Sequence, residues 1–470
     1  MLQNNKFLAL VAVLSLATVP AAGAQNAPKA VPGLDQIQHI IVIYLENRSF
    51  DQLYGLFPGA NGIANAGEAA IQVDKAGKPY EKLPPVLNTD LKSPGSRRPA
   101  PVDTRFPTGL PNGPFRADPY AGLDQTTGDA VHRFYQQQLQ INDGKMNQFV
   151  AWTDAGALVM SYYDGARLPL WDYAKRYVLM DNFFHAAFGG SFLNHMWLVC
   201  ACTPIYRDAP RRLFAKLDAN GNLEEDGAIT PDGYVVNTAY ARAGPYPKQV
   251  SDPAFRVPEQ DLPNIGDRLS AKNISWAWYA GGWGDALAGK PHSDFQFHHQ
   301  PFAYFRNTAV GTKGANEHLK DENDLIADIG KGRLPQVVFF KPNGTNNEHP
   351  GYTNVLAGER HASELIRMIE KSSLWKTSLI IVTYDENGGF WDHVAPPKID
   401  RWGPGVRVPA ILISPVAKEG FVDHTQYDTT SILKLIETRF GLAPLGARDA
   451  NAADMTHALD LAADQKPMVR

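Results

Sequence analysis

Residues 39–55 read HIIVIYLENRSFDQLYG, and this stretch decides the fold. It opens with an apolar run over residues 39–45, which is typical of a strand buried on both faces of a parallel sheet. The acidic Glu46 and the amide Asn47 follow the run at once. Because functional groups collect at the carboxyl ends of strands in open α/β sheets, the stretch predicts both a central strand and the sheet edge that carries a site.

Further apolar runs lie at residues 177–184, 337–340, 379–384 and 406–414, and each is followed by polar or glycine-rich sequence. They are interpreted as buried parallel strands of the same sheet. Between residues 340 and 379, the apolar positions of segment 354–375 fit one face of a helix. This strand–helix–strand order predicts an α/β fold with a mostly parallel central sheet flanked by helices.

The N-terminus has the layout of an export signal. Residues 1–24 contain one charged side chain, Lys6, an apolar run over residues 7–19 and a small-residue cleavage pattern before Gln25. The apolar run is too short to span a bilayer, although a retained membrane anchor is the alternative interpretation. We therefore expect a signal peptide over residues 1–24 and an exported protein, periplasmic or secreted, without stable membrane insertion.

The rest of the chain, residues 25–470, is expected to form a single domain. Its long insertions near residues 61–121 and 204–263 are rich in proline, glycine and polar residues, and such stretches commonly form the walls of a site. The chain has 45 Lys and Arg residues against 49 Asp and Glu residues, a formal net charge of −4. This mild charge, without long basic runs, predicts no nucleic-acid-binding surface.

The two cysteines, Cys200 and Cys202, are separated by one residue. A bridge across so short a spacing would be strained, so we expect two buried thiols within a helix. A framework of disulfides is excluded by the cysteine count.

Acidic residues follow two of the predicted strands. Asp385 and Glu386 come after residues 379–384 in the same way that Glu46 and Asn47 follow the first strand. Each pair alone is more often a helix cap or a pair of solvated loop residues. Four oxygen-bearing side chains brought to one sheet edge can bind a hard cation, and the occurrence of both pairs after apolar strands favours that interpretation.

Residues 189–197 read GGSFLNHMW, a glycine turn that leads into a helix. Ser191 at the helix start can act as a helix cap, which alone would explain its presence. The same position faces free backbone N–H groups and the positive end of the helix dipole, which suits a phosphate and an oxygen nucleophile. A Ser-His-Asp hydrolase is a rival interpretation, but Phe192 and Leu193 replace the pattern G-x-S-x-G.

At this point the sequence resembles a known family, the phosphoesterases that include bacterial phospholipases C and acid phosphatases. Residues 39–55 are similar to the opening motif of that family. Three more segments match in order, at residues 189–195, 346–351 and 384–397, the last reading YDENGGFWDHVAPP. The resemblance extends over about residues 39–442, and its first and last motifs are long and specific.

The resemblance implies a fold similar to the alkaline phosphatase superfamily core, one divalent metal ion and Ser191 as the catalytic nucleophile. The residues that it places at the metal are Glu46, Asn47, Ser191, Asp385 and Glu386. Those that it places around the phosphoryl group of the substrate are His132, Asn194, His299 and His349, with His298 as the alternative to His299. A single histidine is, by itself, more often structural. Oxygen ligands favour Ca²⁺, Mg²⁺ or Mn²⁺ over Zn²⁺.

Two branches of the family remain open. The phospholipases resemble T-x-P-N-R at the nucleophile, whereas residues 191–195 read SFLNH, which is similar to the acid phosphatases. The chain also ends soon after a predicted helix at residues 431–440, without the additional C-terminal domains of the phospholipases. We therefore expect an exported, metal-dependent acid phosphatase that hydrolyses small-molecule phosphate monoesters through a phosphoserine. The alternatives are a phospholipase C acting on phosphodiester headgroups and a non-enzymatic exported binding protein.

Overall fold

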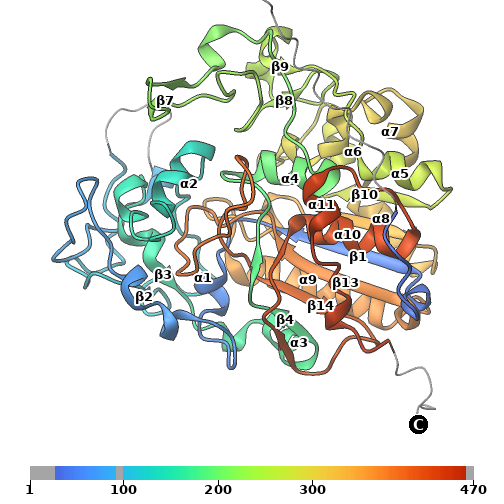
Figure 1. The fold of residues 1–470 in the computed structure, drawn as a ribbon, viewed down its shortest axis with the longest axis horizontal. Coiled ribbons are helices and arrows are strands. Elements are labelled where there is room, and N and C mark those ends of the chain that lie inside the picture. Colours follow the sequence, from blue (N-terminus) through green and yellow to red (C-terminus); the bar gives the residue numbers. More distant parts are fainter. Residues whose placement is uncertain (1–26, 92–98, 462–470) are drawn as a thin grey trace, which may run out of the picture.

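The central sheet has eight strands in the order β11-β10-β12-β1-β13-β14-β4-β15 in the computed structural model, which describes residues 27–91 and 99–461 (Figure 1). The strands are β1 (His39–Leu45), β4 (Val178–Met180), β10 (Trp276–Ala280), β11 (Leu319–Asp321), β12 (Val337–Lys341), β13 (Ser378–Tyr384), β14 (Ala410–Ile413) and β15 (Phe421–Asp423). All run in one direction except β14, which is antiparallel to β13 and β4. The predicted α/β class is confirmed. The predicted signal peptide lies outside the described residues.

Strand β1 occupies the middle of the sheet, and this position explains why its sequence is apolar. It pairs in parallel with β12 on one side and with β13 on the other. Ile41, Val42 and Ile43 have no exposed surface, because neighbouring strands cover their edges and helices cover both faces of the sheet. Burying such side chains stabilises the fold by about 1.5–3 kcal/mol each, before the opposing conformational entropy.

Helices cover both faces of the sheet. They are α1 (Phe50–Tyr54), α2 (Phe134–Ile141), α3 (Pro169–Arg176), α4 (Ser191–Cys200), α5 (Ile265–Ala271), α6 (Trp283–Leu287), α7 (Lys313–His318), α8 (Glu322–Gly330), α9 (Val355–Glu370), α10 (Thr429–Phe440) and α11 (Ala447–Asn451). Helix α9 packs with α3 and α8, whereas α10 packs with α4 and α11 (Figure 1). The helix expected within residues 354–375 is α9, and the Asn354 side chain caps it by accepting a hydrogen bond from the N–H of Ala357. Among the residues that the structure describes, no helix is long and apolar enough to cross a membrane.

Two of the predicted strands differ from expectation. The run at residues 406–414 contributes β14, which is antiparallel rather than parallel. The run at residues 177–184 is divided into β4 and β5 (Phe183–Phe184), because the buried Asp181 turns inward and its carboxylate accepts a hydrogen bond from the N–H of Asn61. Strands β10, β11 and β15 were not expected; β10 reads WAWYA, and β11 and β15 are only three residues long.

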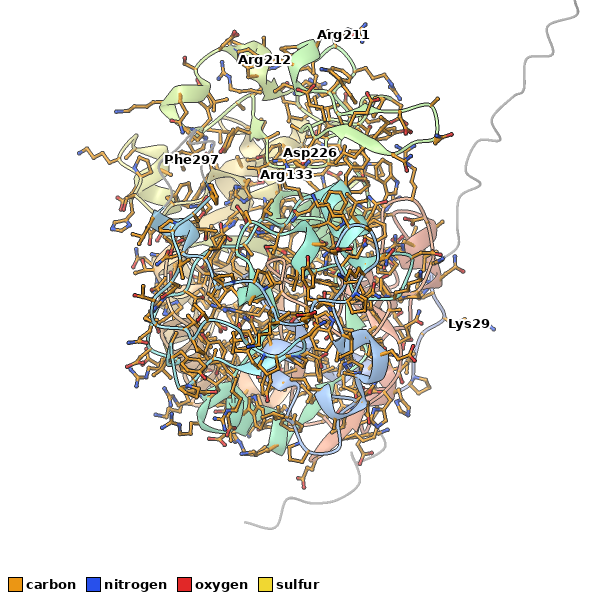
Figure 2. The ribbon with its side chains drawn as sticks, turned by 90° about the vertical axis from the view of Figure 1, so that its left-hand side faces the viewer. Lys29, Arg133, Arg211, Arg212, Asp226 and Phe297 are labelled. Carbon is orange, nitrogen blue, oxygen red and sulfur yellow. A yellow bond between two sulfur atoms is a disulfide. The ribbon has the colours of Figure 1, made fainter. Side chains whose placement is uncertain are left out.

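The predicted insertion near residues 204–263 forms a lobe above α2 and α4 (Figure 1). Short strands shape it: β6 (Lys216–Leu217), β7 (Leu223–Glu225), β8 (Tyr240–Ala241) and β9 (Arg256–Val257). Arg211 and Arg212 lie at the top of the lobe, whereas Asp226 lies low in it and pairs with Arg133 at the start of α2 (Figure 2). The other insertion, near residues 61–121, carries β2 (Phe115–Arg116), which pairs with β3 (Ser161–Tyr162).

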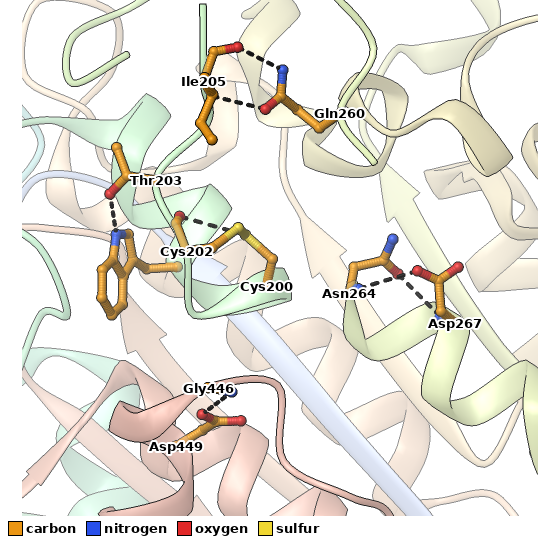
Figure 3. Close-up of a disulfide and its surroundings, with 10 residues drawn as sticks. Cys200, Cys202, Thr203, Ile205, Gln260, Asn264, Asp267, Gly446 and Asp449 are labelled. Atoms are coloured by element: carbon orange, nitrogen blue, oxygen red, sulfur yellow. Dashed lines mark hydrogen bonds between the residues drawn. A yellow bond between two sulfur atoms is a disulfide. The ribbon is translucent and has the colours of Figure 1, made fainter. Parts of the chain in front are cut away.

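The two cysteines form a disulfide, so the expectation of two buried thiols is wrong (Figure 3). Helix α4 ends at Cys200, and Ala201 adopts a left-handed conformation with φ of 46°. The reversal of the chain brings the Cα atoms of Cys200 and Cys202 to 5.0 Å, within the range that a disulfide spans. The expectation assumed that the helix continues through Cys202.

Replacing both cysteines by serine is expected to lower the free energy of unfolding by about 1–2 kcal/mol, because the bridge closes a very short loop. Urea unfolding of the wild type and of the Cys200→Ser, Cys202→Ser protein measures the difference. A reductant should destabilise the wild type by the same amount and leave the double variant unchanged. A loss above about 4 kcal/mol, or none, would contradict the expectation.

A buried pair of carboxyl groups links α9 to the loop after β12. Glu348 and Glu359 are both fully buried. The Tyr384 hydroxyl donates to Glu348 Oε2 at 3.0 Å, and the Leu170 N–H donates to Glu359 Oε2 at 2.7 Å. Burial raises the pKa of Glu348 to about 8. Burial and the negative charge of Glu348 raise the pKa of Glu359 well above its ordinary value.

This pair makes stability depend on pH. The unfolded glutamates ionise near pH 4.5, whereas the folded ones hold their protons, so the folded state binds more protons and loses stability as pH rises from about 4.5 to 8. Each group contributes a slope of at most about 1.4 kcal/mol per pH unit. Glu359→Gln is therefore expected to unfold at higher urea concentration than the wild type at pH 8, with a smaller difference at pH 5.

The matched control is Glu364→Gln on the exposed face of the same helix. It removes one glutamate without touching the buried pair, so its stability should follow the wild type at both pH values. A Glu359→Gln protein that is less stable than the wild type at pH 8 would show that this carboxyl group is ionised in the folded state.

Candidate active site

Two turns at the carboxyl end of the sheet carry the predicted metal ligands. Strands β1 and β13 pair in register, with Leu45 opposite Tyr384, so Glu46 and Asp385 emerge side by side. The N–H of Asn47 donates to Asp385 Oδ1 at 3.1 Å. Glu46, Asn47, Asp385 and Glu386 all have no exposed surface. The structure thus brings these four residues together.

The two turns approach each other so closely that one of them needs a glycine. A Cβ atom on Gly388 would lie 2.6 Å from the carbonyl oxygen of Asn47, and Gly388 also has a φ of +62°. Asn47 itself has a positive φ of 60°, a conformation that costs energy for a residue with a side chain. The surrounding structure therefore holds Asn47 in a strained orientation at the sheet edge.

The oxygen atoms of this cluster are those that a cation would satisfy. Asn47 Oδ1, Asp385 Oδ2 and Glu386 Oε1 are buried and have no hydrogen-bond partner among the described residues. Burial and the charge of Glu46 raise the pKa of Asp385 well above its ordinary value, and burial raises the pKa of Glu386 to about 7. Leaving such groups unpaired is costly, and a divalent cation between them would remove the cost. The acidic groups therefore fit a metal ion.

Ser191 is the first residue of α4 and lies beside Glu46. Its hydroxyl donates to Glu46 Oε2 at 3.1 Å. The residue that caps the helix is Gly190, and within the described chain the Ser191 side chain makes no capping hydrogen bond. The interpretation of Ser191 as a helix cap is therefore wrong. The start of α4 supplies backbone N–H groups and the positive end of the helix dipole next to the hydroxyl.

The histidines expected around the phosphoryl group surround the same carboxylates. His299 Nε2 lies 3.0 Å from Glu46 Oε1, and His349 Nε2 lies 3.9 Å from Glu46 Oε2. His132 Nε2 lies 3.6 Å from Glu386 Oε1. Of the two adjacent histidines, His299 is the one that faces Glu46. The ring of His298 stands edge-on against it, with 4.6 Å between the ring centroids.

The charge states of these imidazoles differ. Burial lowers the pKa of His299 to about 4 and also lowers the pKa of His349. Burial disfavours the charged form of His132 too, but the carboxylates of Glu386 and Asp129 outweigh that effect and raise its pKa to about 9. The neighbouring carboxylates therefore favour the protonated form of His132, whereas burial favours the neutral forms of His299 and His349.

Two residues that the sequence analysis did not assign also belong to the cluster. Lys341, the last residue of β12, has no exposed surface, forms an ion pair with Glu46 and donates from Nζ to the Leu45 carbonyl at 3.1 Å. His195 donates from Nδ1 to the Ser191 carbonyl at 2.7 Å, and its ring stacks on His299 with 4.9 Å between centroids. The available signals were a lysine that ends an apolar strand and a histidine one helical turn after Ser191.

Asn194 takes a different place from the one expected. Its side chain accepts a hydrogen bond from the N–H of Ala187 at 2.9 Å and donates to the Ala187 and Gly190 carbonyls at 3.0 and 3.2 Å. The side-chain amide of Asn194 therefore forms its hydrogen bonds with the glycine turn before α4. It fixes the turn that positions Ser191, and its assignment to the substrate-binding residues stays a prediction.

A buried ion network lies next to the two ligand-bearing turns. Arg407 donates to Asp392 Oδ1 at 2.8 Å and to Asp51 Oδ1 at 3.2 Å. Asp51 in turn accepts from His393 Nδ1 at 2.6 Å. Asp51 follows β1 and Asp392 follows β13, so one arginine ties both segments together. His393 therefore has a structural partner outside the candidate site.

A small cavity opens next to the cluster. Its volume is about 220 Å³, and its lining includes Asp129, His132, Gly190 and Phe192. Asn237 of the lobe completes its wall. The cavity therefore gives access to His132 and to the start of α4.

Comparison with known proteins identifies the family. The sequence profile of the Phosphoesterase family matches residues 37–443. Phospholipase C A of Mycobacterium tuberculosis is 26% identical over 486 aligned residues, which cover 92% of this chain and 79% of that protein. Non-hemolytic phospholipase C of Pseudomonas aeruginosa is 23% identical, and its alignment covers 95% of this chain and 60% of that protein.

Solved structures that match include a protein in the alkaline phosphatase superfamily from Vibrio parahaemolyticus, with 11% identity, coverage of 65% of each chain and a TM-score of 0.34. Murine ectonucleotide pyrophosphatase / phosphodiesterase 5 matches with 10% identity and a TM-score of 0.34, over 62% of this chain and 94% of that chain. The family profile covers most of this chain, so the resemblance seen in the sequence motifs is confirmed. The chain belongs to the Phosphoesterase family.

Proposed function

We propose that this chain is an exported, metal-dependent phosphoesterase that cleaves phosphodiesters of the phospholipase C type through Ser191. The observation that carries the proposal is the Ser191 hydroxyl at the start of α4, 3.1 Å from Glu46 Oε2, in a cluster where one oxygen each of Asp385 and Glu386 has no hydrogen-bond partner among the described residues. Membership of the family supports hydrolysis of phosphate esters. The names of the relatives, phospholipases C, support a diester substrate better than the monoester expected from the sequence.

The residues of the chain supply the steps of an in-line displacement. The Ser191 oxygen attacks phosphorus as its hydroxyl proton is released, the bond to the leaving alcohol breaks, and the departing oxygen takes up a proton in place of the one released. Backbone N–H groups at the start of α4 and the cationic His132 stabilise the charge on the phosphoryl oxygens. Water then attacks the phosphoserine and restores the Ser191 hydroxyl. When bound, the metal ion would lower the pKa of the Ser191 hydroxyl and neutralise charge at phosphorus.

The ligands proposed for one divalent ion are Glu46, Asn47, Ser191, Asp385 and Glu386. Each of them offers oxygen, and hard cations with oxygen ligands are Ca²⁺, Mg²⁺ and Mn²⁺. Zn²⁺ prefers nitrogen and sulfur in its ligand set. We therefore propose one of the three hard cations over zinc.

A second candidate function is the acid phosphatase that the sequence analysis favoured. The observation in its support is the sequence SFLNH at residues 191–195, which departs from the phospholipase pattern T-x-P-N-R. The small cavity of about 220 Å³ lined by His132, Gly190 and Phe192 is compatible with a phosphate monoester as well. The substrate comparison described below distinguishes the two functions.

Export is proposed on two grounds. Residues 1–24 have the layout of a signal peptide. The disulfide between Cys200 and Cys202 is a second ground, because disulfides form and persist in oxidising compartments such as the periplasm and the extracellular space.

The test of the proposed function compares a phosphatidylcholine diester with a soluble phosphate monoester at several pH values. Hydrolysis of the diester at the higher kcat/KM is expected. Ser191→Ala should lower kcat by at least about 10³-fold with an unchanged melting temperature, because the attacking oxygen is lost. Ser251→Ala, at an exposed position of the lobe, serves as the matched control. Preference for the monoester would favour the second candidate, and near-normal turnover by Ser191→Ala would remove Ser191 as nucleophile.

Metal dependence is tested on the purified active protein by elemental analysis. One divalent ion per chain is expected. Asp385→Asn keeps the shape of the side chain but removes a charged ligand, so metal affinity and activity should fall together by at least about 10–100-fold. Asp285→Asn, at an exposed position, should keep its metal. A fully active wild type without a stoichiometric divalent ion would overturn the ligand assignments.

A further inference from the structure

One charged side chain of the cluster has no part in the chemistry described so far. Lys341 is the last residue of β12 and has no exposed surface. Its ammonium forms an ion pair with Glu46 Oε1 and donates to the Leu45 carbonyl at 3.1 Å. Nζ also lies 5.2 Å from the centroid of the Tyr44 ring. A buried cation is costly unless nearby groups compensate its lost hydration, and Glu46 provides that compensation here.

The two oxygens of Glu46 face different partners. Oε1 pairs with Lys341 and lies 3.0 Å from His299 Nε2. Oε2 accepts a hydrogen bond from the Ser191 hydroxyl at 3.1 Å. Because the ion pair holds Oε1, the carboxylate cannot turn this oxygen toward Ser191 without losing Lys341. Lys341 therefore determines which oxygen of Glu46 lies beside the proposed nucleophile.

The groups around Glu46 have the composition of a second cation site. Glu46, His195 and His299 each place a ligand atom within 4.8 Å of the other two, and all three side chains are buried. His195 donates from Nδ1 to the Ser191 carbonyl, and its Nε2 has no hydrogen-bond partner among the described residues. Two imidazoles and a carboxylate form a ligand set that binds Zn²⁺ in other proteins.

The tautomer of His195 suits such a site. Burial lowers the pKa of His195 well below its ordinary value, and the positive charge of Lys341 adds to that effect. A neutral ring that donates from Nδ1 carries a lone pair on Nε2. The ring is parallel to that of His299, with 4.9 Å between the centroids. A buried lone pair without a partner costs free energy, and a cation next to it would remove that cost.

The charges at this edge of the sheet give Lys341 a second importance. The ligands proposed for the divalent ion include three buried carboxylates, those of Glu46, Asp385 and Glu386. One divalent ion supplies two positive charges, and Lys341 supplies the third. Without Lys341, one negative charge would stay uncompensated in a buried place, where charges attract each other strongly. The site would then attract a further cation.

We propose that Lys341 is a positioning residue whose ammonium takes the place of a second metal ion at Glu46. Without this ammonium, Glu46, His195 and His299 would form a second cation site. With it, Oε1 is occupied, and Oε2 alone remains for Ser191 and for one divalent ion. The inference rests on the proposed function for the role of that divalent ion. It adds the residue that restricts the site to a single ion.

The experiment replaces Lys341 by methionine, which is similar in length and carries no charge. Wild type and Lys341→Met are stripped of metal, titrated with Zn²⁺ by calorimetry and analysed for zinc after gel filtration. The variant is expected to retain one more Zn²⁺ per chain than the wild type, because the freed oxygen and two imidazole nitrogens can bind it. With the divalent ion of the wild type supplied, its kcat should be at least about tenfold lower, since Glu46 is no longer held in one orientation.

Two control variants locate the additional ion. Lys331→Met removes an exposed lysine at the end of α8 and should match the wild type in zinc content and in activity. Lys341→Met combined with His195→Gln lacks one of the three ligands and should lose the additional ion. A merely structural role of Lys341 would lower the melting temperature and the activity without adding a zinc ion. That result, or an additional ion that persists without His195, would overturn the inference.

If Lys341→Met is recovered only as unfolded protein, Lys341→Gln replaces it. The glutamine amide can donate hydrogen bonds as lysine does, but it carries no charge, so the same additional Zn²⁺ is expected. Refolding of either variant should also give more folded protein with Zn²⁺ than without it, because the ion restores the missing charge. The absence of any zinc-dependent gain in folding or binding in both variants would overturn the inference.

The inference and the proposed function fail in different ways. Zinc content is compared without turnover, so an inactive wild type leaves the comparison intact. If the wild type binds no divalent ion and Lys341→Met binds one, the ligand assignments of the proposed function fail and the role of Lys341 is retained. If the wild type already binds two ions, or if both proteins bind the same number, the inference is overturned while hydrolysis through Ser191 can stand.

Discussion

The parallel, in-register pairing of β1 with β13 is the constraint on which the site depends. It places Leu45 opposite Tyr384, so the residues that follow both strands must share one small volume. Three carboxylates and an amide meet there without exposure to water. Such an arrangement is unfavourable unless positive charge is added, because a buried carboxylate without a partner loses its hydration. The fold therefore concentrates buried negative charge at one point, where a cation would stabilise it.

The chain provides positive charge to its buried carboxylates in two different ways on neighbouring parts of the same edge. Around Asp51 and Asp392 it supplies its own cation, the buried Arg407, and the network is complete. Around Glu46 it supplies Lys341 to one oxygen, and one oxygen each of Asp385 and Glu386 has no hydrogen-bond partner within the described residues. The first cluster holds the turns in place, whereas the second is left able to bind an ion. Removing Arg407 would leave the buried Asp392 without its cationic partner, so the network supports the site without belonging to it.

The sequence predicted those elements whose hydrophobic pattern matches their place in the folded structure. Strand β1 was predicted with its boundaries, because a short β-branched apolar run that ends in polar sequence is typical of a strand buried in a sheet. The direction of β14 could not be predicted, because strand polarity depends on connections and not on side-chain pattern. Lys341 received no assignment from the sequence, and only the pairing of β12 with β1 shows that it is buried beside Glu46. The disulfide was missed because it depends on a single left-handed residue, Ala201, which no periodicity reveals.

The lobe at residues 204–263 leaves and rejoins the core at one place. The side chain of Gln260 accepts a hydrogen bond from the N–H of Ile205 at 2.8 Å and donates to its carbonyl at 3.1 Å, so the two ends of the lobe are fastened to each other (Figure 3). Because the ends are fixed relative to each other, the length of chain between them can change at a small entropic cost. The sheet and its charged edge do not have to adjust when it does. Such a module can be exchanged between homologous proteins, which would let selection change the surface above the site while the charged edge of the sheet is retained.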